Sequence, residues 1–308
     1  MGPRVVGTQL ERLVCGLFKV NVAALLLLGA QQDALVQLTQ PGTDSLKLYA
    51  AFRLASIYPF FLYANFSGYI DMVMAVARLM RLRLPENFDR PFAAASFIDF
   101  WSRWHITLSS WLKTYIYNPL LTMSMRRIAT QRLKSLLGVL CFFATFFLVG
   151  IWHGRTTEFV FFGVLQGGGV AINKLWQIAL SGMLGRKRYK QVAAGAVYTA
   201  LARGLTFTWF SLTLFWFWGD WKRIASIYAV LGMERWCAVG LGFWLIASSA
   251  LALWEGLRRA LMSLRTSAGP ILASRYFRVV YASAMGLTVL AFLFFSNQPA
   301  PDIVYKAF

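Results

Sequence analysis

Long apolar stretches dominate this sequence and leave few folds open to it. Several of them approach the roughly 20 residues that a helix needs to cross the hydrocarbon core of a bilayer. They run continuously rather than alternating apolar and polar residues, which favours membrane helices over barrel strands. We therefore predict an all-α, polytopic bundle of membrane helices, with the main stretches at 48–80, 135–151, 157–180, 192–218, 238–257 and 279–295.

The charged residues support this interpretation. Only 14% of the 308 residues are charged, whereas a soluble domain has about 25%. The 31 Lys and Arg residues far outnumber the 12 Asp and Glu residues, and they gather in short groups between apolar stretches, as in cytoplasmic loops. No basic stripe has the spacing of base contacts, so we expect membrane lipid and not nucleic acid as a partner. The groups are Arg126, Arg127, Arg132 and Lys134; Arg186, Lys187, Arg188 and Lys190; and Arg258, Arg259, Arg265, Arg275 and Arg278.

The cysteines give no sign of a disulfide framework or a zinc site. Cys15, Cys141 and Cys237 are far apart in the chain and form no CxxC pair. An odd number of cysteines without ligand spacing argues against both. We expect no bound metal.

The two histidines, His105 and His153, are the strongest candidates for chemistry. His153 ends an apolar run and precedes a glycine. A neutral imidazole can accept a proton near pH 7, and burial favours the uncharged ring, so His153 suits a general base acting on a hydroxyl. Gly150 and Gly154 are expected to let a substrate approach the backbone. Both histidines could instead be interfacial residues with satisfied hydrogen bonds.

The residues around His105 predict an amphipathic helix over 99–117. On such a helix His105 lies on the apolar face, four residues after Trp101, and Asp99 pairs with Arg103. The helix would lie in the membrane interface or enter the membrane as a re-entrant element. If the three basic groups are cytoplasmic, the spans alternate and His153 lies near the extracytoplasmic end of its span, on the same side as residues 218–223.

The stretch 48–80 carries three residues that are unusual in a membrane helix. Pro59 and Gly68 predict a kinked or broken helix. An acid at membrane depth costs about 2.5–3.5 kcal/mol on insertion scales, so Asp71 should face the protein interior or water. Arg78 or another base is its expected structural partner.

Four motifs occur in an order that resembles a known family: FSGYID at 66–71, LPENFDRP at 84–91, FWSRWHITLS at 100–109 and GIWHG at 150–154. Together they are similar to the bacterial branch of the membrane-bound O-acyltransferase family, which includes proteins of alginate O-acetylation and teichoic-acid D-alanylation. The resemblance runs from about residue 50 to the C-terminus. The closing residues 301–308 look like a degraded version of the family's aromatic end.

The resemblance implies kinked and re-entrant helices around a tunnel, where an acyl group from a cytoplasmic thioester meets a hydroxyl acceptor from the other side. It implies a catalytic role for His153 and a second functional role for His105. The donor, an acyl-CoA or an acyl carrier protein, is a co-substrate, and no cofactor is expected to stay bound. The residues expected to bind substrate are Trp104, Trp152, Arg103 and Asn87.

The expected protein is a multi-pass acyltransferase of the bacterial cytoplasmic (inner) membrane. Its acceptor would be an extracytoplasmic polysaccharide or cell-envelope polymer, with or without a periplasmic or extracellular acyltransferase as partner. Acetyl is the first choice of acyl group and D-alanyl the second. Family members are usually longer, so residues 1–308 are interpreted as one membrane-embedded domain without the N-terminal helices of longer homologues. The alternatives are a non-catalytic truncated scaffold and a small-solute transporter.

Overall fold

The computed structural model describes residues 2–126, 131–267 and 275–296. In these ranges the chain is helical apart from turns, short loops and one isolated antiparallel bridge, which confirms the all-α prediction. Contacts divide the chain into two compact units, Met1–Pro85 with Leu253–Ala307 and Glu86–Ala252. The expectation of a single domain over 1–308 stays a prediction.

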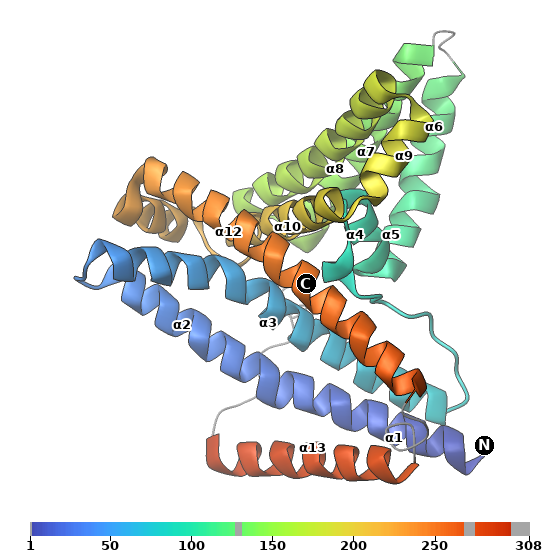
Figure 1. The fold of residues 1–308 in the computed structure, drawn as a ribbon, viewed down its shortest axis with the longest axis vertical. Helices are drawn as coiled ribbons and strands as arrows, with labels where there is room; N and C mark the ends of the chain where they lie inside the picture. Colours follow the sequence, from blue (N-terminus) through green and yellow to red (C-terminus); the bar gives the residue numbers. More distant parts are fainter. Residues whose placement is uncertain (1, 127–130, 268–274, 297–308) are drawn as a thin grey trace. The chain divides into compact units, whose positions relative to one another are not determined.

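The first unit begins with an unbroken helical run against which α3 packs. The run consists of α1 (Pro3–Phe18), η1 (Lys19–Ala24) and α2 (Leu25–Thr39), and Figure 1 shows α2 and α3 (Asp44–Leu79) side by side. The sequence predicted a kinked or broken helix in α3, and of these two alternatives the break is wrong. The helix continues through Pro59, which is buried, and we attribute its continuity to the packing on both sides, which offsets the hydrogen bond that proline cannot make.

The α1–η1 run crosses α3 at two glycines. A Cβ atom on Gly16 would lie 2.7 Å from the Gly68 carbonyl oxygen, and a Cβ atom on Gly68 would lie 2.9 Å from the Gly16 carbonyl oxygen. Beside this crossing the Asp71 carboxylate accepts hydrogen bonds from Arg12 Nε at 2.9 Å and Lys19 Nζ at 2.7 Å. The prediction that Asp71 pairs with a base is confirmed, and its partners come from the N-terminal helical run.

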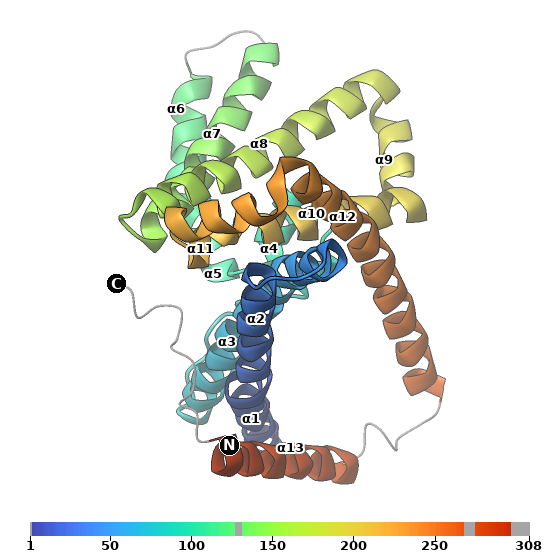
Figure 2. The same ribbon diagram turned by 90° about the vertical axis from the view of Figure 1, so that its left-hand side faces the viewer.

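The C-terminal helix α13 (Arg275–Ser296) packs against α1 in the same unit. Figure 2 shows it running across the end of α1. Arg278 Nε donates to Glu11 Oε2 at 2.8 Å, which ties the two helices together by charge. Parts of the predicted basic groups, and the family-like C-terminal end, lie outside the described residues or side chains: Arg127, Arg132, Arg265, Arg275 and residues 301–308.

The second unit carries most of the short helices. After η2 (Pro91–Ala93) they are α4 (Phe97–Arg103), α5 (Ile106–Leu112), η3 (Lys113–Tyr117) and α6 (Asn118–Met125), followed by α7 (Gln131–His153), α8 (Thr157–Leu184), α9 (Arg186–Ala194), α10 (Ala196–Thr213), α11 (Phe215–Trp218) and the start of α12 (Trp221–Ser267). The predicted span 192–218 is wrong as one helix, because the chain leaves helical geometry at Gly195 and the helix is interrupted again at Leu214. Gly232, with φ +74°, interrupts α12.

Helices α7 and α8 form an antiparallel pair joined by the short turn 154–156. Figure 2 shows them close at this turn and diverging away from it. A Cβ atom on Gly150 would lie 2.3 Å from Gly163 N, and one on Gly163 would lie 2.4 Å from Phe147 O. The space beside Gly154 is likewise filled, by the Phe159 ring. The expectation that Gly150 and Gly154 admit a substrate is therefore wrong, because α8 occupies that space.

Five helical segments among the described residues are long and apolar enough to cross a membrane, which confirms a polytopic membrane protein. They are Pro3–Thr39, Asp44–Leu79, Leu133–His153, Trp221–Ser263 and Tyr276–Ser296. Helix α8 covers the predicted span 157–180 but is not among them. Its sequence is interrupted by polar and glycine residues, from Gln166 to Gly169 and at Asn173 and Lys174, which lowers its apolar character.

Candidate active site

His105 lies at a break between two short helices. Helix α4 ends at Arg103 and α5 begins at Ile106, so the continuous helix predicted over 99–117 is wrong. His105 adopts φ +47° and ψ +55°, a left-handed conformation that only surrounding structure can hold in a residue with a side chain. The support comes from the preceding loop, whose backbone pairs antiparallel with the break.

Residues 87–89 and 103–106 form a short two-stranded contact. Phe88 pairs with Trp104 in the isolated bridge. The Asp89 amide donates to the Arg103 carbonyl at 2.9 Å, and the Ile106 amide donates to the Asn87 carbonyl at 3.0 Å. The loop thus satisfies backbone groups that a continuous helix would have satisfied itself. The LPENFDRP and RWH motifs meet in space for this reason.

The side chain of Asn87 lies under the same break and is 4% exposed. Its Oδ1 lies 3.1 Å from Thr107 N, 2.9 Å from Thr107 Oγ1 and 3.2 Å from His105 Nδ1. Burial lowers the pKa of His105 from its ordinary 6.5 to about 4, so the ring is neutral at pH 7. The predicted substrate residue Asn87 is thus in contact with one of the two histidines.

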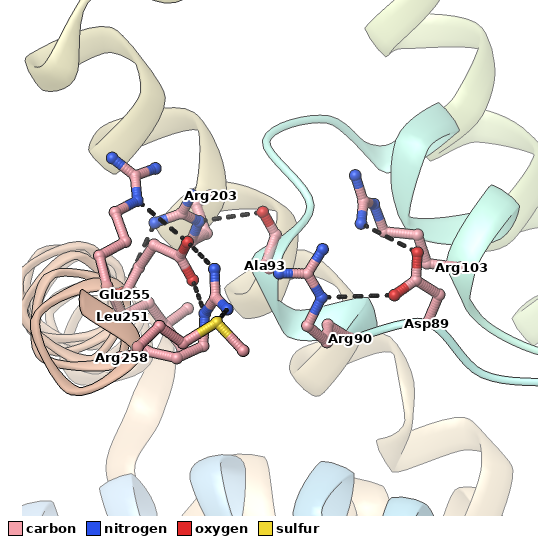
Figure 3. A network of polar contacts seen from close by, with 10 residues as sticks. Asp89, Arg90, Ala93, Arg103, Arg203, Leu251, Glu255 and Arg258 are labelled. Carbon is pink, nitrogen blue, oxygen red and sulfur yellow. Dashed lines mark hydrogen bonds and ion pairs between the residues drawn. The ribbon is translucent and has the colours of Figure 1, made fainter. Parts of the chain in front are cut away.

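Arg103 lies on the opposite, polar side of this segment. Its Nε donates to Asp99 Oδ1 at 2.9 Å, which confirms the predicted i,i+4 pair. Its Nη1 also lies 3.6 Å from Asp89 Oδ2, and Arg90 contacts the same carboxylate at 3.3 Å. Figure 3 shows Asp89 between the two arginines. The ion pair of Asp89 with Arg103 could not be predicted from the sequence, because it forms across the bridge and not one helical turn along the chain.

A second arginine, Arg203 on α10, ties η2 into the unit. It is 8% exposed, and its Nε donates to the Ala93 carbonyl at 3.1 Å (Figure 3). Its Nη1 lies 3.5 Å from the Leu251 carbonyl. Nothing in the local sequence distinguishes Arg203 from a surface arginine, so this residue could be found only from the fold.

The two predicted tryptophans lie in different surroundings. Trp104 is 5% exposed and packs between aromatic rings, with ring-centroid distances of 5.1 Å to Phe88, 5.7 Å to Phe100 and 5.2 Å to Phe210. Trp152 is 41% exposed. Trp104 therefore belongs to the aromatic core beneath His105, while Trp152 retains surface that a ligand could contact.

His153 is the last residue of α7 and faces an aromatic cluster. Its ring centroid lies 4.9 Å from that of Phe217, 6.0 Å from that of Phe162 and 6.5 Å from that of Phe159. Within the described part of the chain, neither ring nitrogen of His153 makes a hydrogen bond to another residue. These three phenylalanines come from α8 and α11, and their spacing in the sequence does not point to His153.

Trp152 contacts both histidines. Its ring centroid lies 4.8 Å from that of His153 and 6.0 Å from that of His105. The two imidazoles, which come from separate motifs, are therefore both in contact with one indole. This juxtaposition makes the His105–Trp152–His153 group the candidate active site.

The start of α12 lies at the same end of α8 as His153. The Trp221 amide donates to Glu158 Oε1 at 3.1 Å, and Trp221 Nε1 donates to Thr157 Oγ1 at 2.8 Å. These bonds place Trp221 beside the start of α8, next to the α7–α8 turn, and the extracytoplasmic side of His153 and residues 218–223 stays a prediction. Among the described residues, no three His, Cys, Asp or Glu side chains are placed to hold a metal ion.

The fold is that of a polytopic helical membrane protein, and in it two histidines contact one tryptophan. Residues 45–215 match the sequence model of MBOAT, the membrane-bound O-acyltransferase family. The match covers more than half of the 308 residues, and the chain belongs to this family. The resemblance carried by the four motifs is confirmed.

Three curated relatives that match this chain are named for different acyl transfers. A peptidoglycan O-acetyltransferase of Helicobacter pylori is 36% identical over 135 residues, which is 44% of this chain and 24% of that protein. A teichoic acid D-alanyltransferase of Streptococcus thermophilus is 32% identical over 120 residues, 39% of this chain and 29% of that protein. A probable alginate O-acetylase of Pseudomonas aeruginosa is 37% identical over 114 residues, 37% of this chain and 20% of that protein. The matched part thus spans less than a third of each relative.

Proposed function

We propose that this protein is a membrane O-acyltransferase of the bacterial cytoplasmic membrane. It transfers an acyl group from a cytoplasmic thioester, an acyl-CoA or an acyl carrier protein, to a hydroxyl of an extracytoplasmic polysaccharide or cell-envelope polymer. The observation that carries the proposal is the contact of Trp152 with both histidines in a chain of this family. Acetyl is the preferred acyl group and D-alanyl the second, because relatives named for each transfer match the chain.

In the proposed reaction, His153 acts as general base. It removes the proton of the acceptor hydroxyl as the oxygen attacks the thioester carbonyl carbon. The carbon–sulfur bond breaks, the ester forms, and the proton passes from the imidazolium to the leaving thiolate. Phenyl rings lie around His153 and would limit the access of water, and hence hydrolysis of the thioester, while the acceptor is bound.

The remaining site residues are assigned by their surroundings. Trp152 has exposed surface and would contact the acyl group or the acceptor. Trp104 would close the inner wall of the site from within the aromatic core, and Arg103 would meet the charged part of a substrate at the polar side. His105 orients the donor or assists in proton transfer. Asn87 would act through the segment that it holds.

The test uses chromosomal alleles, so that the protein is made from its own gene. Cell-envelope polysaccharide is treated with mild base, and the released acyl groups are identified by mass spectrometry. The wild type is compared with a deletion, with His153→Ala and with Gly168→Ala at matched membrane abundance. Gly168 is the control, because a Cβ atom there meets nothing within 4 Å.

The proposal expects ester-linked acetate or alanine in the wild type and in Gly168→Ala, and its loss in the deletion and in His153→Ala. General-base catalysis contributes typically about 10²–10⁴-fold in rate, so residual ester in His153→Ala should be small. Equal ester content in the wild type and the deletion would contradict the proposed activity. Equal content in the wild type and His153→Ala would remove His153 from the reaction.

A further inference from the structure

We infer that Asn87 and Thr107 hold His105 in the tautomer that carries its proton on Nδ1, so that Nε2 is the basic nitrogen of this ring. The consequence of this inference for catalysis rests on the proposed function. The tautomer of His105 itself does not depend on that function. The inference makes Asn87 and Thr107 positioning residues. It also narrows the role of His105 to accepting a proton or a hydrogen bond at Nε2.

The first step identifies the atom of Asn87 that faces the ring. A backbone N–H group can only donate, and the Thr107 amide lies 3.1 Å from the Asn87 side-chain atom assigned as Oδ1. The assignment of an amide side chain is a choice between oxygen and nitrogen, and it is settled by such a donor. A nitrogen at this position would bring N–H against N–H. The atom is therefore the oxygen.

The second step assigns the proton on His105. An amide oxygen only accepts hydrogen bonds. His105 Nδ1 lies 3.2 Å from Asn87 Oδ1, so the hydrogen between them must come from the ring nitrogen. In a neutral imidazole only one nitrogen carries a hydrogen, and Nε2 is then the nitrogen with the lone pair.

The third step concerns Thr107, whose hydroxyl lies near the same nitrogen. Thr107 Oγ1 donates to Asn87 Oδ1 at 2.9 Å and lies 3.5 Å from His105 Nδ1. Because its hydrogen is directed to Asn87, the hydroxyl presents lone pairs to the ring. Asn87 Oδ1 and Thr107 Oγ1 thus each present an acceptor to Nδ1, and both favour the Nδ1–H tautomer.

The backbone makes this arrangement rigid. Asn87 is 4% exposed, and its carbonyl accepts from the Ile106 amide at 3.0 Å, so both its side chain and its main chain bind the segment that carries His105. The left-handed conformation of His105 turns the chain between α4 and α5. Asn87 thus supplies both the side-chain oxygen that sets the tautomer of His105 and the carbonyl that holds the turn.

The inference gives His105 and His153 distinct environments. His105 is hydrogen-bonded at Nδ1, whereas His153 lies among phenyl rings without a hydrogen bond to any described residue. A ring locked with Nε2 as its base cannot donate from Nε2 until it has been protonated there. His105 would therefore receive a proton, from the attacking hydroxyl or from His153 as a relay, before it could return one to the leaving thiolate.

The direct test reads the tautomer by NMR. The full-length protein is labelled with ¹⁵N-histidine and reconstituted in lipid bilayers at pH 7. Because the chain has two histidines, a His153→Gln variant assigns the signals. The inference expects a protonated Nδ1 and a lone-pair-bearing Nε2 for His105 in the wild type. The reverse assignment in the wild type would overturn it, and this measurement requires neither a site variant of Asn87 nor acyl transfer.

Variants then test the cause. Asn87→Leu replaces the side-chain amide by an apolar group of similar size, so the ring loses its acceptor. His105 should then shift toward the Nε2–H tautomer or a mixture of the two. Asn65→Leu is the control, since Asn65 is another fully buried asparagine, and neither polar atom of its side chain has a hydrogen-bond partner among the described residues. If Asn87→Leu is not recovered as folded protein, Thr107→Val, which retains Asn87, should still weaken the preference for Nδ1–H. An unchanged tautomer in a folded variant of Asn87 would refute its positioning role.

The effect of Asn87 on catalysis is measured by the rate of acyl transfer and its dependence on pH. Asn87→Asp keeps an acceptor at the ring but adds negative charge, so it should preserve the Nδ1–H tautomer and move the acid limb of the pH–rate profile to higher pH. Asn87→Leu should lower acyl transfer by roughly 10²-fold, the lower end for loss of a general base. A purely structural role for Asn87 predicts loss in both variants and no shift of the profile. If the wild-type protein shows the expected tautomer but no acyl transfer, the result would contradict the proposed function and leave the tautomer inference standing.

Discussion

The glycines between α7 and α8 provide the sharpest test of how the site is held. In Gly150→Ala, the new methyl group would lie 2.3 Å from Gly163 N, 2.3 Å from Phe159 O and 2.4 Å from Gly163 Cα. All three are backbone atoms, so relief requires a shift of one helix relative to the other. Overpacking of this kind costs about 1–3 kcal/mol. Gly150 precedes His153 by less than one helical turn, so the shift also displaces the candidate base.

A second glycine in the same helix pair supplies the matched control. Gly168 in α8 has nothing within 4 Å of an added Cβ atom, and alanine is favoured over glycine in a helix by about 1 kcal/mol. Both glycines lie in helices, so this gain is the same in the two variants. They should therefore differ in free energy of unfolding by about 1–3 kcal/mol, with Gly150→Ala the less stable. Unfolding in mixed micelles with increasing denaturing detergent measures this difference. Equal stability of the two variants would refute the close crossing.

Three further predictions concern charges and hydrogen bonds. Asp71→Asn leaves Arg12 and Lys19 without their carboxylate, which is 17% exposed, and should cost about 3 kcal/mol in detergent unfolding; wild-type stability would contradict the ion cluster. Because burial lowers the pKa of His105 from 6.5 to about 4, the unfolded chain binds a proton first as pH falls, so stability should decrease from about pH 6.5 toward pH 4 by up to about 1.4 kcal/mol per unit. His105→Gln should abolish this contribution to the dependence of stability on pH. An unchanged dependence in the variant would contradict the lowered pKa of His105. Trp221→Phe removes the 2.8 Å bond from the indole to α8 and should cost about 1 kcal/mol in the same assay.

The Asp71 cluster shows what a membrane setting makes predictable. An unpaired acid at membrane depth is so unfavourable that the sequence alone requires a partner. The sequence does not indicate which base pairs with Asp71. Arg12 and Lys19 reach this carboxylate because Gly16 and Gly68 let the α1–η1 run and α3 approach closely. That choice depends on packing between helices distant in sequence.

The class of fold and the local Asp99–Arg103 pair could be predicted from the sequence alone, and the motifs marked the two histidines as candidates. Apolar stretches of membrane length and i,i+4 contacts are properties of a single segment, so segment patterns suffice to predict them. Periodicity failed at His105, where it predicted one helix over 99–117. The loop at Asn87 supplies competing backbone hydrogen bonds there, and no local pattern reports them.

The contacts that build the site could not be read from the sequence. The tertiary structure placed Trp152 in contact with both imidazoles, surrounded His153 with phenylalanines from α8 and α11, and set Asn87 against His105 Nδ1. It also assigned Gly150 to helix packing rather than to substrate approach. These are contacts between segments far apart in the chain. Their geometry is fixed by how the helices cross and where they break, which a one-dimensional pattern of apolar and polar residues does not specify.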